Sequence, residues 1–458
     1  MTRPDMLHNT HRAAHCPGNL SGWRPGLLAC AVILGLTSCA EAPKKRVEEK
    51  KAATVLVYPL PPDDPRFYFE RTIYSSGDVV AEEKKEESLQ DLLTGKSSGS
   101  SQDRFRKPYA VVVHKGRIFV SEPRSKVIRV FDVPEGRYFT IGDKDPGGLS
   151  QPLGIDVDRA GNLYVADAKA KAIMVYDRDG KFLRTLATAK TGEPELFKRM
   201  ASVTVDKNGD RIYVVDVGGS PQGRQEYHRV RVFDARSGEH LFDIGKRGTG
   251  SGEFNLPKDV AIGKNKQIYV VDSANFRIQV FDEQGKYVKD FGKLGSKLGS
   301  FGRPKEIATD ADGNVYVIDA VFANFQIFNA DGELLMFIGK GAYPEGPARY
   351  EMPSGIYVDE DGRIYVVDQL YKKLDIFRPA ALGADDGYLG KRLPRGEKSA
   401  NIGLAGGASG ESVSVQKSQG ADSSNDGLPV GKPLSAEEPG ENAPVDPADE
   451  NNPEGDEP

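Results

Sequence analysis

One phrase recurs along the chain and constrains its fold more than any other feature. Its clearest copy, residues 268–282, reads Ile-Tyr-Val-Val-Asp-Ser-Ala-Asn-Phe-Arg-Ile-Gln-Val-Phe-Asp. Two strand-like runs are joined there by a short polar link that opens with an aspartate. The first run and its closing acid recur at Leu163–Asp167, Ile212–Asp216, Val315–Asp319 and Ile364–Asp368, and in a weaker form at Ile118–Glu122. The chain therefore carries six copies of one unit.

The spacing of these units indicates the fold class. Successive closing acids lie 45 to 56 residues apart, which is the length of one four-stranded propeller blade. Alternation within each run buries one residue in two against the neighbouring blade, so the core is spread around a ring. The sequence predicts an all-β protein, a six-bladed β-propeller over residues 104–379.

Each unit also has a regular beginning and regular turns. A proline opens the first strand at Pro152, Pro257, Pro304 and Pro353, and Met200 takes its place in the third unit. Turns such as Asp310-Ala-Asp-Gly313 follow, where glycine adopts the positive φ that a tight hairpin needs. The last unit ends at Pro379 without a fourth strand. We therefore expect residues 67–74, Phe-Tyr-Phe-Glu-Arg-Thr-Ile-Tyr, to supply it; the alternative is a free edge strand or ordered linker.

The N-terminus reads as an export signal. Arginines precede an apolar run at residues 26–36, which is followed by Thr37, Ser38 and Cys39. The run is shorter than the roughly twenty residues that span a bilayer. Residues 36–39, Leu-Thr-Ser-Cys, resemble the bacterial lipoprotein box, which implies cleavage of residues 1–38 and acylation of Cys39. The alternative is an ordinary secretory signal, and translation starts at Met1 or Met6.

The remaining segments lie outside the repeats. We expect a charged and proline-rich tether at 39–66, a flexible linker at 75–103 and a disordered tail at 380–458. From Asn401 onward the tail holds twelve acidic and two basic residues, whereas the whole chain has a net charge of −5. The three cysteines, Cys16, Cys30 and Cys39, all precede the repeats, so no disulfide framework is expected there.

The repeats resemble NHL repeats. The glycine-rich lead-in, the proline, the Tyr-Val-x-Asp run and the Arg-Ile-Gln-Val-Phe run at residues 277–281 all have counterparts in that family. The third unit departs from the pattern, with an insertion at residues 218–228. The resemblance implies a six-bladed propeller but leaves function open, because this scaffold hosts binding modules and several enzymes.

Several residues were weighed for chemistry. The repeated acids are expected to accept hydrogen bonds from backbone N–H groups of the adjoining loop; they are Glu122, Asp167, Asp216, Asp272, Asp319 and Asp368. Aspartate-rich turns such as 310–313 lack the glutamate of a calcium loop, and we predict no metal and no cofactor. The propeller offers only His114, His228 and His240, too few for the zinc chemistry of the similar amidating lyases. Among the acids that begin inner strands, Asp156, Asp259 and Glu306, the last two adjoin lysines, which suggests local ion pairs.

One loop-built surface mixes aromatic and basic residues, which suits binding of a protein segment or an anionic ligand. The residues of this candidate binding face are Arg124, Lys126, Lys169, Lys171, Tyr227, His228, Arg229, Phe276, Arg277, Phe322, Tyr371 and Lys372. Connecting loops on the same side add Lys198, Arg199, Lys246, Arg247, Lys297 and Arg303.

These observations lead to one functional prediction and one alternative. We expect a non-enzymatic, lipid-anchored and monomeric propeller that binds an envelope protein or an anionic ligand. Ala40 after the modified cysteine implies the bacterial outer membrane, with the face unspecified. An exported protein does not routinely meet RNA, so no nucleic-acid partner is expected. The alternative is a metal-dependent hydrolase or lyase with its site at the central channel mouth. A third possibility is that the acidic tail is itself the functional ligand for a cation or a cell-wall polymer.

Overall fold

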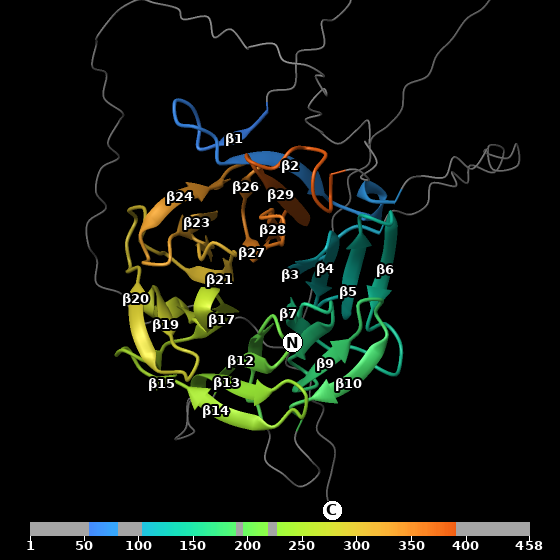
Figure 1. Ribbon diagram of the computed structural model, residues 1–458, viewed down its shortest axis with the longest axis vertical. Helices are drawn as coiled ribbons and strands as arrows, with labels where there is room; N and C mark the ends of the chain where they lie inside the picture. The colour runs from blue at the N-terminus through green and yellow to red at the C-terminus, as the bar shows by residue number, and fades with distance from the viewer. Residues whose placement is uncertain (1–54, 81–102, 189–195, 219–226, 391–458) are drawn as a thin grey trace, which may run out of the picture. The chain divides into compact units, whose positions relative to one another are not determined.

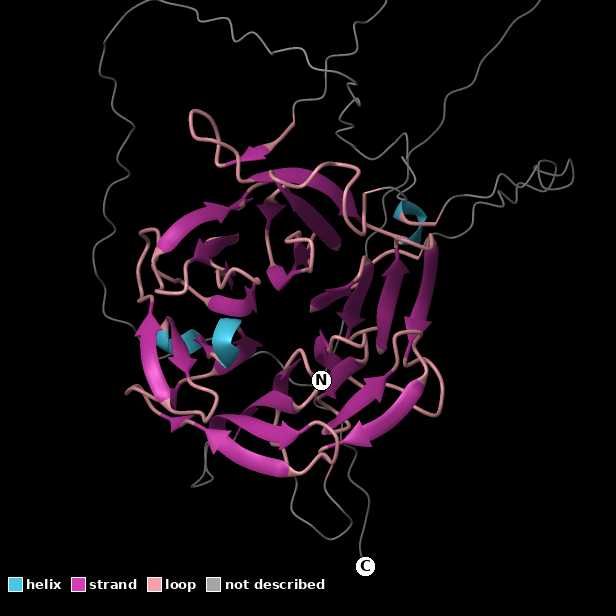
Figure 2. Cartoon of the chain, viewed as in Figure 1, coloured by secondary structure: helices cyan, strands magenta, loops and turns pink. Residues whose placement is uncertain are grey.

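The computed structural model describes residues 55–80, 103–188, 196–218 and 227–390. In these ranges the chain forms a ring of six antiparallel sheets around a central channel (Figure 1). Helix is limited there to three short 3₁₀ turns, η1 (Ser76–Asp78), η2 (Lys264–Lys266) and η3 (Ser273–Asn275) (Figure 2). The prediction of a six-bladed, all-β propeller is confirmed.

Blades one to three each use four consecutive strands, ordered from the channel outward. Blade one has β3 (Val111–His114), β4 (Arg117–Glu122), β5 (Val127–Asp132) and β6 (Arg137–Ile141). Blade two has β7 (Pro152–Val157), β8 (Leu163–Asp167), β9 (Ala172–Tyr176) and β10 (Phe182–Leu186). Blade three has β11 (Met200–Val205), β12 (Arg211–Gly218), β13 (Tyr227–Asp234) and β14 (His240–Ile244).

Blades four to six repeat this plan. Blade four has β17 (Pro257–Ile262), β18 (Ile268–Asp272), β19 (Arg277–Phe281) and β20 (Tyr287–Phe291). Blade five has β21 (Pro304–Thr309), β22 (Val315–Asp319), β23 (Asn324–Phe328) and β24 (Leu334–Ile338). Blade six has β27 (Pro353–Val358), β28 (Ile364–Asp368) and β29 (Lys373–Pro379), followed outward by β2 (Phe67–Ile73) and β1 (Val57–Tyr58). Two-stranded pairs in the connecting loops are β15 (Lys246–Arg247) with β16 (Glu253–Phe254), and β25 (Lys340–Gly341) with β26 (Arg349–Tyr350).

Blade six joins the two ends of the repeat region. Strand β2 runs antiparallel to β29, with pairs from Phe67 opposite Pro379 to Ile73 opposite Leu374. The Thr72 hydroxyl donates to Asp375 Oδ1 at 2.7 Å, a side-chain bond across the same seam. A strand from before the repeats thus completes the last sheet, and no edge of the ring is left open between blades six and one.

The core consists of six apolar clusters, each between two neighbouring blades. The cluster between blades five and six, for example, joins Phe325 to Ile356 and Phe377, all at most 4% exposed. This arrangement follows from the alternation in the Tyr-Val-x-Asp runs, which directs apolar side chains to both faces of each sheet.

Three boundaries differ from the sequence expectation. The tail was placed from residue 380, yet Leu389 is fully buried in the cluster between blades six and one, and Arg363 Nη2 donates to the Asp386 carbonyl at 2.9 Å. The linker was placed from residue 75, yet Val79 after η1 is buried in the same cluster. The tether includes β1. Single apolar residues within these polar segments, such as Leu389 and Val79, are therefore buried against the propeller.

The export signal, Cys39 and the acidic residues from 401 onward lie outside the described residues. Within the described residues, no helix has the length and apolar character needed to cross a membrane.

Candidate functional site

The repeated acids hold the loop that leads into each blade. Asp167 accepts from the backbone N–H groups of Ser150 at 2.6 Å and Gln151 at 3.0 Å, on the segment before β7. It also accepts from Ala170, in the link after its own strand. Loop N–H groups bond the equivalent acids in the other blades, Glu122, Asp216, Asp272, Asp319 and Asp368. These carboxylates are fully buried and occupied by the fold.

Several residues of the candidate binding face are held by contacts within the ring. Arg229 bonds Asp216 at 3.0 Å and Asp243 at 2.8 Å, and its guanidinium lies over the Tyr227 ring. Arg277 bonds Asp272 at 2.9 Å and three loop carbonyls. His228 is buried, and its Nδ1 accepts from the backbone N–H of Leu256.

The other residues of that face differ in exposure. Phe276 packs against the cluster between blades four and five. The Tyr371 hydroxyl donates to the Ala342 carbonyl at 2.8 Å. Lys171 and Phe322 are half-buried. The fully exposed members are Arg124, Lys126, Lys169 and Lys372.

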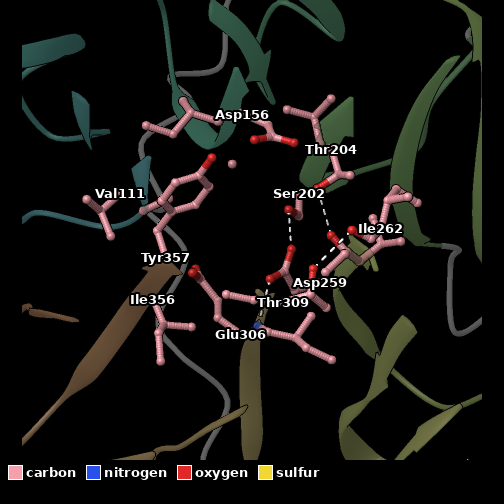
Figure 3. Close-up of a pocket in the computed structure, with 18 of the residues that line it drawn as sticks. Val111, Asp156, Ser202, Thr204, Asp259, Ile262, Glu306, Thr309, Ile356 and Tyr357 are labelled. Carbon is pink, nitrogen blue, oxygen red and sulfur yellow. Dashed lines mark hydrogen bonds between the residues drawn. The ribbon is translucent and has the colours of Figure 1, made fainter. Parts of the chain in front are cut away.

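The central channel forms a cavity in the described chain. It has a cavity volume of about 70 Å³, and the inner strand of every blade lines it. Figure 3 shows polar side chains from four blades pointing into it, among them Asp156, Ser202, Glu306 and Tyr357. The channel therefore combines an apolar wall with a few convergent polar groups, the usual composition of a ligand site.

Three carboxyl groups line this channel; we call Asp156, Asp259 and Glu306 the inner carboxyls. Asp259 accepts from the Ser202 hydroxyl at 2.5 Å and from the backbone N–H of Ile307 at 2.9 Å. Burial raises the pKa of Asp259 to about 6 despite these bonds. Burial, and then the Asp259 carboxylate, raise the pKa of Glu306 well above its usual range, with Lys305 opposing. Burial likewise raises the pKa of Asp156. A buried carboxyl with a pKa of about 6, such as Asp259, can exchange a proton near neutral pH.

The sequence expectation for two of these acids is corrected. Asp259 and Glu306 were interpreted as ion-paired with the neighbouring lysines, Lys258 and Lys305. In the described structure neither carboxylate lies within the 4.0 Å that defines an ion pair of any Lys or Arg nitrogen. Successive strand residues face different directions, so sequence neighbours do not pair as side chains.

Four cations of blades three to five lie at the end where the inner strands begin; we call Arg199, Lys258, Arg303 and Lys305 the cationic rim. Lys258 and Lys305 are the second residues of β17 and β21, and Arg199 and Arg303 immediately precede β11 and β21. Burial, and then Arg199 and Arg303, lower the pKa of Lys258. Burial lowers the pKa of Lys305 to about 8, with Lys258 and Arg303 adding to that effect and Glu306 opposing it. The neighbouring positive charges thus disfavour the protonated forms of both lysines.

Tyr109, which precedes β3 of blade one, lies next to the cationic rim. The Lys305 ammonium lies 5.6 Å from the centre of its ring. Burial, and then Glu306 and Asp259, raise the pKa of the Tyr109 hydroxyl, while Arg199 opposes them. The tyrosine therefore lies where the rim and the inner carboxyls meet.

A hydrogen bond crosses the other end of the channel. Lys207 follows β11 in blade three, and its Nζ donates to the Tyr357 hydroxyl of β27 in blade six at 2.9 Å. We call these two residues the floor pair. Burial raises the pKa of Tyr357 to about 12, with the Lys207 charge opposing. Among the described residues, no group of three or more His, Cys, Asp or Glu side chains is arranged to hold a metal.

A family model identifies one blade directly. The NHL repeat matches residues 254–281, which run from the loop before β17 to the end of β19. The protein is a six-bladed β-propeller that carries an NHL repeat in blade four. The resemblance noted in the sequence is confirmed.

Curated relatives of this NHL propeller include an enzyme. A probable peptidyl-alpha-hydroxyglycine alpha-amidating lyase of Caenorhabditis elegans is 31% identical over 119 residues, 25% of this chain and 30% of the relative. NHL repeat-containing protein 3 of Homo sapiens is 32% identical over 112 residues, 24% of this chain and 30% of the relative. A solved structure of streptogramin B lyase aligns with a TM-score of 0.43 and 14% identity, over 60% of this chain and 94% of that one. The chain spans about a third of the length of these two curated relatives.

One functional prediction is wrong. The repeats predict a propeller without enzymatic activity, whereas the matched relatives include a probable amidating lyase. The small number of histidines in the repeats drove that expectation. It gave no weight to carboxyl groups as acid–base residues.

Sequence reasoning missed most of the channel site. Asp156, Asp259 and Glu306 were noticed but assigned no ligand, and Ser202, Lys207 and Tyr357 were not considered. The sequence does contain an indication of this site. Carboxyl residues such as Asp156 and Glu306 are rare in strands that pack only against apolar neighbours, so their presence in inner strands indicates a polar cavity.

Proposed function

We propose that this NHL propeller binds a small anionic ligand at the rim end of its central channel. The observation that carries the proposal is the cationic rim. Among the described residues, none of its four cations has a carboxylate within ion-pair distance. Besides burial, Arg199 and Arg303 lower the pKa of Lys258, and Lys258 and Arg303 lower the pKa of Lys305. A bound anion reduces the repulsion between cations held together at a cavity mouth. The combined positive potential of these cations in turn attracts the anion.

The position of the rim adds to this proposal. It opens on the cavity lined by the inner carboxyls, so an anion there lies against a pocket and not a flat surface. Arg199 and Arg303 had been assigned to the binding side from the sequence, and they lie beside Lys258 and Lys305 at the first residues of the inner strands.

Calorimetric titration of the full chain with inorganic phosphate and a panel of short carboxylates tests the proposal. At least one of these anions should bind the natural chain, and Lys258→Met with Lys305→Met should weaken that binding tenfold or more. The matched control is Lys181→Met with Lys286→Met, which removes the same charge from exposed turns at the other end of the blades. Failure of every anion to bind, or equal losses in both double variants, would refute the proposal.

Lyase chemistry on the bound ligand is a second candidate, favoured by the similarity to the amidating lyase. The inner carboxyls would then exchange the proton, because burial raises the pKa values of Asp259 and Glu306 above the ordinary range. Incubation with a peptidyl-alpha-hydroxyglycine should yield product with the natural chain and not with Glu306→Gln. Absence of turnover in the natural chain rejects this activity without affecting the binding proposal.

We further propose that the chain is exported and acylated on Cys39, on the basis of the signal-like residues 26–39. Incorporation of labelled palmitate into the natural chain, and its loss in Cys39→Ser, is the expected result in a bacterial host. Labelling that persists in Cys39→Ser would contradict it.

A further inference from the structure

The floor pair joins two blades that face each other across the ring. Lys207 belongs to blade three and Tyr357 to blade six, and 150 positions of sequence separate them. Both residues line the central cavity, and the Lys207 ammonium also lies 5.2 Å from the centre of the Tyr357 ring. The pair therefore crosses the channel at the end opposite the rim, where Lys207 remains exposed to solvent.

The Tyr357 hydroxyl still has a hydrogen to donate. The ammonium of Lys207 can only donate, so the phenolic oxygen accepts in that bond. Within the described residues, no hydrogen bond uses the phenolic hydrogen of Tyr357. Each oxygen of the nearby Asp156 already accepts a backbone N–H, from Val157 at 2.8 Å and from Val205 at 3.0 Å. Figure 3 shows the Tyr357 ring extending into the cavity.

The charge beside this hydroxyl strengthens it as a donor. A phenol that accepts from an ammonium is polarised, because the positive charge withdraws electrons from its O–H bond. Tyr357 nevertheless stays protonated at neutral pH, since burial raises its pKa to about 12. The neutral Tyr357 hydroxyl can therefore donate a hydrogen bond to an uncharged acceptor, such as a carbonyl oxygen of a ligand.

The distance from rim to floor limits the length of the ligand. Lys305 is the second residue of β21 and Tyr357 the fifth of β27, and both strands begin at the same end of the channel. At about 3.3 Å per strand residue, the two levels lie roughly 10 Å apart. Lysine and tyrosine side chains extend into that space, so the free span is shorter and suits a short carbon chain.

We propose that the floor pair is the inner subsite of this pocket, where Tyr357 donates a hydrogen bond to a carbonyl oxygen at the far end of an anionic ligand. The inference rests on the proposed function, because the rim must hold the anionic group. The ligand class is a short oxo acid or ester-bearing acid, with its carboxylate or phosphate at Lys258 and Lys305.

The test compares two probes that differ by one carbonyl group. Levulinate carries a ketone near the end of a five-carbon carboxylate, and valerate is the same chain without it. Levulinate should bind the full chain about fivefold to tenfold more tightly than valerate in calorimetric titrations, the usual effect of one hydrogen bond. Tyr357→Phe should abolish this preference and leave valerate binding unchanged.

Two further variants separate the floor pair from general charge effects. Lys207→Met should reduce the preference for levulinate, since the phenol loses its polarising partner. Lys264→Met is the matched control, because Lys264 holds the equivalent turn position of blade four and is exposed. Among the described residues, Lys264 makes no hydrogen bond or ion pair across the channel. Urea unfolding of each variant verifies that it is folded.

The outcomes distinguish this inference from the function on which it rests. Equal binding of both acids to the natural chain, or a preference that survives Tyr357→Phe, overturns the floor assignment and leaves the rim in place. If neither acid binds and the rim variants have no effect on any anion, the proposed function fails and the inference fails with it. A preference lost in Tyr357→Phe and kept in Lys264→Met supports it.

Discussion

Arg363 and Glu70 lie 293 positions apart in the sequence, and Arg363 Nε donates to Glu70 Oε2 at 2.8 Å. The guanidinium is completely buried, and it also bonds Asp361 at 3.0 Å and the Asp386 carbonyl at 2.9 Å. One side chain therefore links the N-terminal strand, the last repeat and the segment that follows it. The ring is therefore held closed by this buried ion pair as well as by the hydrogen bonds between β2 and β29.

Glu70→Ala should lower the free energy of unfolding by about 3 kcal/mol, because it leaves a buried guanidinium with only part of its compensating charge. Urea unfolding followed by circular dichroism measures the change. Asp331→Ala is the control, since Asp331 is 83% exposed in its pair with Lys289, and it should change stability by less than about 0.5 kcal/mol. Equal effects of the two substitutions would show that Arg363 does not secure the ring.

Asp272→Ala should destabilise blade four by about 3 kcal/mol or more, because Asp272 accepts from the Asn255 backbone at 2.6 Å and from Arg277 and Gln279 side chains. The free energy of unfolding from urea titration gives the magnitude. Hydrogen exchange should show the largest loss of protection in the loop before β17. Uniform loss of protection around the ring would argue against this local role.

The inner strands approach one another at glycines. A Cβ on Gly154 would come within 2.6 Å of Ser202 Cα and 2.8 Å of Val203 N on the neighbouring blade. Gly154→Ala should therefore force blades two and three apart and cost about 2 to 3 kcal/mol. Gly341→Ala is the control, because the nearest atom to its added Cβ is a side chain at 3.5 Å. Thermal unfolding of both variants provides the comparison, and similar midpoints would contradict the close approach.

The period of the Tyr-Val-x-Asp phrase was sufficient to predict six sheets, because the buried acid and the alternating apolar residues are local requirements of every blade. The role of individual basic residues was not predictable in this way. Arg229 and Arg277 belong to the same pattern as exposed Lys169, yet only the structure shows the acids they contact on adjacent strands.

The channel site was hidden by two further features. The register of β17 with β18 and of β21 with β22 shifts after the opening proline, at Pro257 to Val260 and at Pro304 to Ile307. Such bulges break the two-residue alternation, so the sequence does not show which of Lys258 and Asp259 faces the cavity. Lys207 and Tyr357 meet only because the ring closes, and no local pattern connects them.

The raised pKa of Asp259 predicts a pH dependence of stability. A carboxyl whose folded-state pKa is about 6, against an ordinary value of 3.8, binds more protons when folded than when unfolded between those two values. Its contribution is therefore greatest below about pH 4 and is lost as the pH rises through 6. Asp259→Asn imitates the protonated group, so the stability of the natural chain relative to this variant should fall by up to about 3 kcal/mol from pH 4 to 7.

Urea unfolding of both chains across this pH range measures that difference. Ser202→Ala supplies a second check, since it removes the 2.5 Å hydrogen bond that favours the ionised carboxylate. In that background the midpoint of the pH-dependent difference should move upward. A difference that stays constant from pH 4 to 7 would show that Asp259 does not retain its proton in the folded state.

The crowding of the cationic rim can be measured at one lysine. Lys305 has its pKa lowered to about 8, first by burial and then by Lys258 and Arg303. Lys258→Met removes one of the repelling charges, which favours the protonated form, so the pKa of Lys305 should rise. NMR titration of the chain carrying ¹³C-dimethylated lysines, with Lys305→Arg to assign the signal, reports this shift. An anion bound at the rim should raise the same pKa by the same electrostatic argument, and a Lys305 signal insensitive both to Lys258→Met and to phosphate would show that the four cations do not act as one site.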